Sequence, residues 1–406
     1  MHATSRAPST GYTSRRIATV SLDGERTDVT VYLQRYTFDL LSNFTFFLDD
    51  PVRGDELRQM ESRWTYGGRL RQRVRLDARL EMTVGLDARI DRIDGLGFQQ
   101  TERGRTIVAR SLADTREAAL SGFAEARWKP SGPLTLTGGA RIDHFRFRSI
   151  ARVGTAIDGR TRATIVTPKA GAALTVARGI ALFANAGQGF HSNDARAVVA
   201  RTDPVPALVR GTGYEVGARL ERGPAVVTID RWWLRSDGEL VFLGDSGTVE
   251  PRGPSSRRGW EATLSLRPAS WFSIDATYAT NHARFTDASE LNRIPNALES
   301  AASLGLTLSS GAWQGALRLR RIGERPLIED DSVRGPATTV VNARIGRTFG
   351  DAEVSLDLLN LFDTRRADAD YFYASRLPDE PLEGRAGVHS RAAEPRQFRL
   401  GLRLKL

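Results

Sequence analysis

The residues best suited to chemistry lie in one short polar stretch, which contains His191, Asn193, Asp194 and Arg196. Together an imidazole, an amide, a carboxylate and a guanidinium supply hydrogen-bond donors, acceptors and a fixed cation. Arg196 could bind an anionic ligand through two parallel hydrogen bonds, and it could equally pair with Asp194 or with a neighbouring strand. The alternative for Asn193 and Asp194 is structural, because such side chains often end strands by bonding their own backbone. The stretch is therefore a candidate for ligand binding.

A second candidate set is aromatic. Tyr371, Phe372 and Tyr373 follow one another inside a long polar segment at 364–395. Aromatic rings in an outer loop can hold a flat ligand, but they could also cap the fold or lie at a lipid interface. We take Tyr371 and Tyr373 as the second pair of ligand-binding candidates.

The sequence shows none of the spacings that mark a catalytic or metal centre. No histidine stands in an H-E-x-x-H or H-x3–5-H pattern, and neither a G-x-S-x-G elbow nor a phosphate-binding loop is present. The chain has no cysteine, which excludes thiol nucleophiles, cysteine zinc sites and disulfides. We therefore expect no enzyme activity, no metal site and no cofactor.

The elements that must position these residues are β-strands. Residues 396–406 alternate Phe and Leu with Gln, Arg, Gly and Lys, and a period of two predicts a strand with one apolar and one polar face. An edge strand of a soluble sandwich could have this pattern, but the closing strand of a membrane barrel needs one face in lipid and the other in a wet lumen. The same alternation recurs at 73–82, 260–267, 272–279 and 353–358. We expect little helix, and no apolar run is long enough for a transmembrane helix.

The connections between these strands alternate in length. The predicted short turns are Lys129–Pro133, Ala177–Gly179, Glu221–Pro224, Pro268–Ser270, Ser309–Ala312 and Phe349–Asp351. The predicted long polar loops are 49–58, 93–115, 149–163, 192–211, 244–256, 285–296, 324–336 and 364–395. Trp128, Trp271 and Trp313 stand beside short turns, as an interfacial aromatic belt requires. Tight turns on one rim and long loops on the other predict an all-β, antiparallel transmembrane β-barrel with about 17 strands.

The net charge of +10 comes almost entirely from arginine, because the chain has only Lys129, Lys169 and Lys405. These charges are spread along strands with Asp and Glu between them, whereas a nucleic-acid site is a concentrated patch. We expect no nucleic-acid partner. The arginines at 73–79, 318–321 and 399–403 should face the lumen and pair with carboxylates there, although attraction of an anionic solute is the alternative. Anionic lipids of the outer leaflet are a further expected partner.

Several motifs occur in an order that resembles TonB-dependent outer-membrane receptors. They cover about 370 residues and are 35–51, Thr167-Pro-Lys-Ala-Gly171, Gly189-Phe-His-Ser-Asn-Asp-Ala-Arg196, Gly213-Tyr-Glu-Val-Gly217, and Asn360-Leu-Phe-Asp363 followed by Tyr371 and Glu394-Pro-Arg396. The resemblance implies that 1–406 is a receptor-like barrel domain in the bacterial outer membrane, in contact with lipid and lipopolysaccharide. It also implies loop capture of a scarce ligand, such as a siderophore, haem, cobalamin or a glycan, and then energised uptake.

The chain departs from the family pattern in three respects. It shows neither a plug sequence nor an energiser-binding box, it contains about 17 of about 22 expected strands, and it ends on Leu406 where an aromatic residue is usual. No apolar signal segment is visible at the N-terminus. We therefore expect the C-terminal barrel portion of a receptor, with the TonB energiser acting only through a plug that this chain lacks. The alternatives are a passive porin-like or non-functional truncated barrel, and a soluble β-rich enzyme or binding protein.

Overall fold

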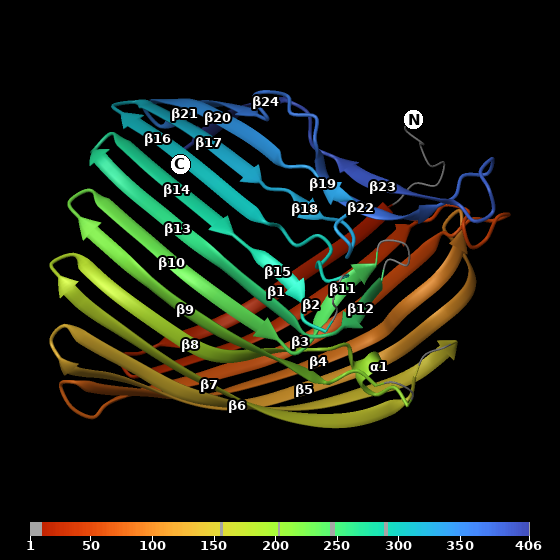
Figure 1. The fold of residues 1–406 in the computed structure, drawn as a ribbon, viewed down its shortest axis with the longest axis horizontal. Coiled ribbons are helices and arrows are strands. Elements are labelled where there is room, and N and C mark those ends of the chain that lie inside the picture. The colour runs from red at the N-terminus through yellow and green to blue at the C-terminus, as the bar shows by residue number, and fades with distance from the viewer. Residues whose placement is uncertain (1–9, 155–156, 202–203, 244–247, 288–290, 406) are drawn as a thin grey trace.

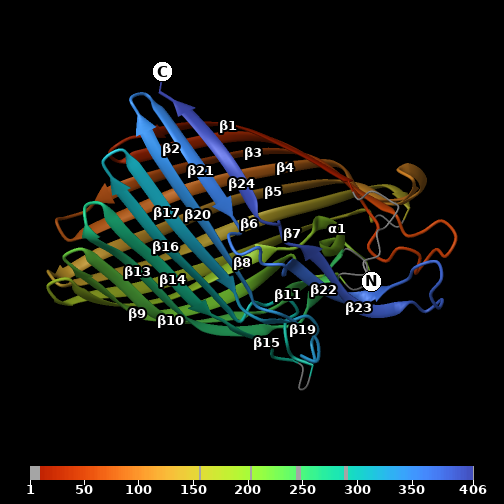
Figure 2. The same ribbon diagram turned by 90° about the horizontal axis from the view of Figure 1, so that it is seen from above.

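The computed structural model describes residues 10–154, 157–201, 204–243, 248–287 and 291–405. This part of the chain forms one large antiparallel sheet that curves into a barrel, with short hairpins added at one rim (Figures 1 and 2). The first half contains β1 (Thr10–Asp23), β2 (Thr27–Ser42), β3 (Leu57–Arg75), β4 (Leu80–Glu102), β5 (Arg105–Ser131), β6 (Leu134–Gly154), β7 (Gly159–Ala177), β8 (Ile180–Ser192), α1 (Ala195–Val198) and β9 (Leu208–Arg222). The second half contains β10 (Ala225–Ser236), β11 (Glu239–Leu243), β12 (Thr248–Arg252), β13 (Ser255–Ala269), β14 (Phe272–Thr280), β15 (His282–Phe285), β16 (Ser300–Ser310), β17 (Trp313–Ile322), β18 (Arg325–Pro326), β19 (Arg334–Gly335), β20 (Thr338–Phe349), β21 (Ala352–Leu359), β22 (Ala367–Ser375), β23 (Arg385–Ala392) and β24 (Gln397–Leu404).

The barrel wall is an 18-stranded sheet in which each strand pairs with the next one along the chain, apart from the inserted hairpins. β14 and β15 both pair with β13 and together form one passage of the chain across the wall. Counted this way, the number of passages agrees with the predicted number of about 17 strands. The described pairings run from β1 at one edge to β24 at the other. Both edge strands run from the rim with long connections to the rim with short turns, since β1 leads into the turn at 24–26 and β24 ends opposite Ala352.

The predicted contrast between the two rims is confirmed. All six predicted short turns join neighbouring strands of the wall, as at β5–β6, β9–β10 and β20–β21. The connection 193–207 is long, and those after β10, β17 and β21 carry the hairpins β11–β12, β18–β19 and β22–β23. The single described helix, α1, has four residues, which agrees with the expected low helix content.

Three of the predicted boundaries are wrong. The segment 149–163 is not a long loop, because β6 continues to Gly154 and β7 begins at Gly159. The segment 93–115 is not a loop, because β4 and β5 continue beyond the rest of the wall and meet in a turn at Arg103 and Gly104, both with positive φ. The segment 73–82 is not one strand, because Asp77 accepts backbone hydrogen bonds from Arg79 at 2.6 Å and Leu80 at 2.8 Å and thereby makes a turn between β3 and β4. Tertiary pairing extends the polar strands at 93–115 and at 149–163, whereas at 73–82 a local side chain ends an alternating strand.

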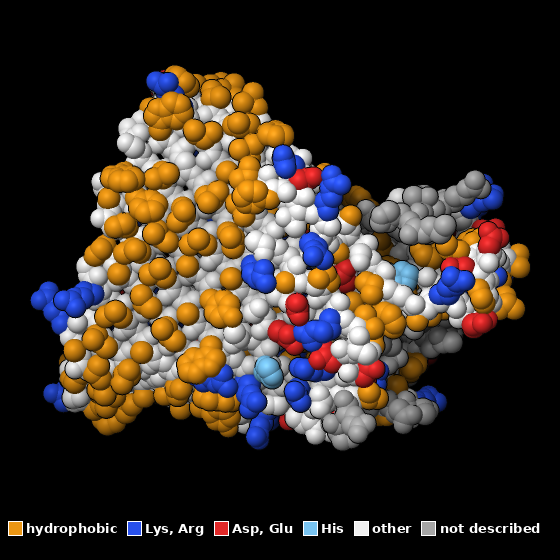
Figure 3. Space-filling view, turned by 45° about the horizontal axis from the view of Figure 1, so that its top comes forward, with side chains coloured by type: hydrophobic (Ala, Val, Ile, Leu, Met, Phe, Trp, Pro, Cys, Tyr) orange, Lys and Arg blue, Asp and Glu red, His pale blue; other side chains and the backbone are white. Residues whose placement is uncertain are grey.

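The outer face of the wall is apolar. The leucines of β24 show this most clearly, since Leu400 is 82% exposed and Leu402 is 69% exposed. Large apolar side chains on β4 to β7 are exposed in the same way, among them Leu86, Leu120, Ile142 and Val166. Figure 3 shows such side chains covering the half of the wall near the short turns, with charged side chains gathered toward the other half. This surface is suited to lipid, because water would oppose the exposure of so much apolar area.

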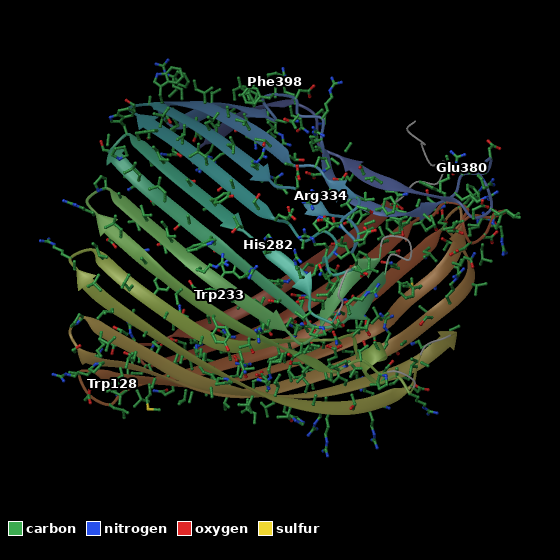
Figure 4. The ribbon with its side chains drawn as sticks, viewed as in Figure 1. Trp128, Trp233, His282, Arg334, Glu380 and Phe398 are labelled. Atoms are coloured by element: carbon green, nitrogen blue, oxygen red, sulfur yellow. The ribbon has the colours of Figure 1, made fainter. Side chains whose placement is uncertain are left out.

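The tryptophans mark the short-turn end of this apolar surface. Trp128, Trp271 and Trp313 are each about half exposed and lie next to turns, as predicted, and Figure 4 shows Trp128 at that rim. Within the described residues, none of the helical structure is long and apolar enough to pass through a membrane.

Candidate functional site

The connection 193–207 folds inward at the barrel mouth. Val198 and Val199 pack on Phe147, which alternation places on the inner face of β6. Asn193 is buried at the start of this connection, where its backbone N–H donates to Ala207 at 3.1 Å and its side-chain amide donates to the carbonyl of Pro206 at 2.7 Å. Asn193 therefore holds the two ends of the connection together.

Asp194 and Arg196 form the pair that sequence analysis allowed as an alternative. Arg196 donates to the Asp194 carboxylate from Nε at 3.0 Å and from Nη2 at 2.7 Å, and its backbone N–H donates at 2.8 Å. Burial opposes ionisation of Asp194, but these hydrogen bonds outweigh it and hold the pKa of Asp194 below its ordinary value. The guanidinium also lies over the ring of Phe98, 5.8 Å from its centroid. The Arg196 charge is thus already neutralised.

His191 is near the end of β8, opposite Val209 of β9. Its Nε2 atom is buried and has no hydrogen-bond partner among the described residues. A buried polar atom without a partner is costly, and the side-chain Oδ1 atom of Asn193 is also buried without one, so these two atoms are the ones in the predicted stretch that most need a partner.

The aromatic candidates lie elsewhere on the rim, on the hairpin β22–β23. Tyr371 is 36% exposed and stands opposite His389, and the ring of Tyr373 stacks on His389 with centroids 3.8 Å apart. Figure 1 shows this hairpin well separated from α1, and Figure 4 places Glu380, in the connection of the hairpin, at the outer tip of the molecule. The structure does not bring Tyr371 and Tyr373 together with the 191–196 stretch.

A cavity of about 580 Å³ lies against the inner wall beside that stretch, and sequence analysis did not find it. Phe190 and Ser192 line it, and the rest of its wall carries alternating charges from four strands. These charged residues are Arg63, Arg69, Asp87, Arg89, Asp91, Glu117, Arg141 and Asp143. The sequence does show Arg and Asp at inward positions of neighbouring strands. Only the strand register, however, shows which of these side chains line the cavity together.

The arginines of this cavity are paired. Arg89 bonds Asp91 at 2.7 Å, Arg141 bonds Asp143 at 2.9 Å, and Arg63 lies 3.7 Å from Asp91. The cavity wall is consequently polar and close to neutral, which suits a hydrated lumen better than a tight site for a small anion.

One or more arginines of each predicted lumen-facing ladder also pair with a carboxylate. Arg73 bonds Asp28 at 2.8 Å, Arg318 bonds Asp275 at 2.6 Å, and Arg403 bonds Glu353 at 3.4 Å. The described residues include no group of three or more His, Asp or Glu placed to hold a metal ion.

A curved antiparallel sheet with an apolar outer face and a polar inner face is the architecture of an outer-membrane β-barrel. The chain belongs to the TonB-dependent receptor family, since the family model described as "TonB dependent receptor-like, beta-barrel" matches residues 3–361. No plug domain is evident among the described residues. No curated protein matches the chain in sequence.

Solved structures have the same fold. The ferric yersiniabactin uptake receptor FyuA from Yersinia pestis is 17% identical, with a TM-score of 0.75 over 97% of this chain and 61% of its own. The ferric citrate transporter FecA in its unliganded form is 16% identical, with a TM-score of 0.74 over 98% of this chain and 62% of its own. The siderophore receptor PiuA from Acinetobacter baumannii is 12% identical, with a TM-score of 0.74 over 98% and 65%. The chain therefore spans less than two thirds of the length of these structures.

Proposed function

We propose that this chain is the barrel portion of an outer-membrane receptor for energised uptake of a scarce ligand such as a ferric siderophore. One observation carries the proposal: the inner wall is polar, and at the rim opposite the short turns the connection 193–207 folds inward onto Phe147 while the hairpin β22–β23 extends the wall. A passive pore needs an open mouth, whereas a receptor needs loops that can close on a ligand. Family membership supports the same reading.

The ligand would be captured without covalent chemistry and without an enzymatic step. We propose that His191 and Tyr371 contact it, since the first has an unpartnered buried Nε2 atom and the second has an exposed ring at the rim. Asn193, Asp194 and Arg196 would shape the connection that carries the capture site, and Tyr373 would hold Tyr371 in place through the hairpin. TonB would act only through a plug, so the energised step requires a plug domain in addition to the described strands.

The proposal can be tested by ligand binding. The chain would be produced in a Gram-negative host, recovered from the outer-membrane fraction, and assayed for saturable binding of a radiolabelled ferric siderophore, a step that needs neither a plug nor the TonB energiser. Tyr371→Ala should weaken binding, whereas Tyr278→Ala, at an exposed tyrosine on the outer face of β14, should not. Binding that is equal in both variants would remove Tyr371 from the site.

A passive pore is the second candidate function, because the sheet encloses a cavity with a polar wall. Planar bilayers distinguish the two candidates. Steady conductance of the reconstituted chain, together with the absence of saturable siderophore binding, would favour the passive pore and overturn the receptor proposal.

A further inference from the structure

An unusual row of charge crosses the outer face of the wall. Arg92 of β4 stands directly opposite Arg116 of β5, Arg116 opposite Arg148 of β6, and Arg148 opposite Arg160 of β7. One row closer to the short turns, Arg146 and Arg162 are also directly opposite each other. We call these six residues the outer arginine patch.

Strand alternation places the patch on the outer face and not in the lumen. Asp143 and Phe147 of β6 are buried on the inner side, whereas Ile142, Arg146 and Arg148 have the opposite parity and are exposed. On β5, Arg116 lies on the same face as Leu120, which is 61% exposed, and on the opposite face from Ser121, which is buried. The patch is thus continuous with the apolar surface that faces lipid.

The position of the patch along the strands matches the edge of a bilayer. A transmembrane strand needs about 9–11 residues to cross the hydrocarbon core. On β5 the outward positions stay uncharged from Trp128 at the short-turn rim to Ala118, and Arg116 is the next outward residue. On β7 they stay uncharged from Val176 to Thr164, and Arg162 and Arg160 follow. The arginines therefore begin where the lipid headgroups of the long-loop side would lie.

The patch has a surplus of positive charge. Arg92 has Asp94 at 3.4 Å, but none of the other five arginines forms a salt bridge within the part of the chain that the structure describes. Like charges directly opposite each other on neighbouring strands repel and destabilise a sheet. These five arginines also line a shallow hollow of about 660 Å³, where an anion could contact several guanidinium groups at once.

We propose that the outer arginine patch binds the phosphate groups of a phosphorylated lipid headgroup in the surrounding leaflet. Guanidinium groups bind phosphate through paired, charge-assisted hydrogen bonds. The acyl chains of the same lipid would lie on the apolar rows beneath, which include Leu120, Ile142 and Val166. A free phosphate ion would gain only the first of these contacts, so the combination selects a lipid. The inference rests on the proposed location in the outer membrane.

The test is lipid retention by the purified chain in detergent. Bisphosphorylated lipid A would be added as the probe, and bound lipid would be measured by native mass spectrometry beside dephosphorylated lipid A and inorganic phosphate. The triple variant Arg116→Gln, Arg148→Gln, Arg160→Gln should retain at least about tenfold less lipid A, because three charge-assisted contacts are lost. The matched control Arg178→Gln, Arg222→Gln, Arg267→Gln removes the same charge at the short-turn rim and should retain it normally.

Each other result would overturn the proposal. Equal loss in both triple variants would mean general charge attraction, and equal retention of dephosphorylated lipid A would mean that the apolar surface alone binds. Displacement by millimolar inorganic phosphate would point to free phosphate and not to a lipid. Heat-dependent migration in gels reports folding of both variants. Since the readout needs no siderophore, failure of the receptor proposal would show in the siderophore-binding assay and leave this result standing.

Discussion

Arg376 donates a hydrogen bond from Nη1 to the carbonyl oxygen of Phe47, 3.2 Å away and 329 residues earlier in the chain. The backbone N–H of Phe47 donates in return to the carbonyl of Arg376 at 3.0 Å, and the N–H of Arg376 donates to Thr45 at 3.0 Å. These bonds attach the hairpin β22–β23, which precedes β24, to the connection that follows β2. The edge strands β1 and β24 are not hydrogen-bonded to each other in the described pairings. The Arg376 contacts therefore connect the two ends of the sheet at the rim with the long connections.

Replacement of Arg376 should open this contact. Arg376 is buried, and its guanidinium also serves the carbonyls of Pro378, Glu380 and Pro381. Arg376→Ala leaves these carbonyls unsatisfied, which should cost about 1–3 kcal/mol locally. Hydrogen exchange should accelerate in 43–56 and in β22–β23. Arg385→Ala, at an exposed arginine near Glu380, is the control and should leave exchange unchanged.

The buried pair between Arg325 and Asp370 should be the most sensitive ion pair in the molecule's outer hairpins. The two side chains are 2.7 Å apart and only 7% and 4% exposed, and Asp370 also accepts a bond from Ser390 at 2.6 Å. Asp370→Asn leaves a buried guanidinium without its counter-charge, so a loss of about 3–5 kcal/mol is expected in denaturant titrations.

The exposed pair between Arg318 and Asp275 provides the comparison. Both side chains are about half exposed, so Asp275→Asn should cost less than about 1 kcal/mol. If Asp370→Asn and Asp275→Asn unfold at the same denaturant concentration, burial does not increase the contribution of the Arg325–Asp370 pair to stability.

A charge on the apolar outer face should destabilise the barrel in lipid. Leu86 lies in the middle of the uncharged outward positions of β4, which run from Leu80 to Ile90. Leu86→Arg should cost about 2–4 kcal/mol in vesicles, because the guanidinium would lie in hydrocarbon. Leu86→Val should cost much less. A Leu86→Arg barrel that folds in vesicles as well as the parent would show that this face does not contact lipid.

Acid should loosen the hairpin β22–β23. Burial lowers the pKa of His389 below its ordinary value, and the hydrogen bond with Tyr373 only partly opposes this shift. The unfolded hairpin therefore binds a proton more readily than the folded one, so its stability falls as the pH drops through about 6.5 toward the lowered pKa. Exchange of hairpin amides measured from pH 7.5 to pH 5 should reveal this trend. His389→Gln, which does not titrate, should abolish it.

The sequence by itself determined the class of fold, the two faces of the strands and the contrast between the rims. Alternation in 397–404 and at 260–267, 272–279 and 353–358 is a local property, because side chains at i and i+2 share a face whatever the partner strand is. Turn residues at Glu221–Pro224 and Phe349–Asp351 act locally in the same way. The order of motifs around Gly189 and Asn360 carried the family resemblance without any knowledge of contacts.

Only the tertiary structure decided which residues meet. Whether Arg196 pairs with Asp194 depends on the local fold of the connection 193–207. Whether 93–115 is a loop or two long strands, and whether Arg116 faces lipid beside Arg148, depend on register, which links strands through hydrogen bonds between distant parts of the chain. A shift of one residue would turn Arg116 and Arg148 to the opposite face. The charged cavity, the Arg376 contact and the outer arginine patch therefore could not be predicted from alternation, because each is made by several strands in one particular register.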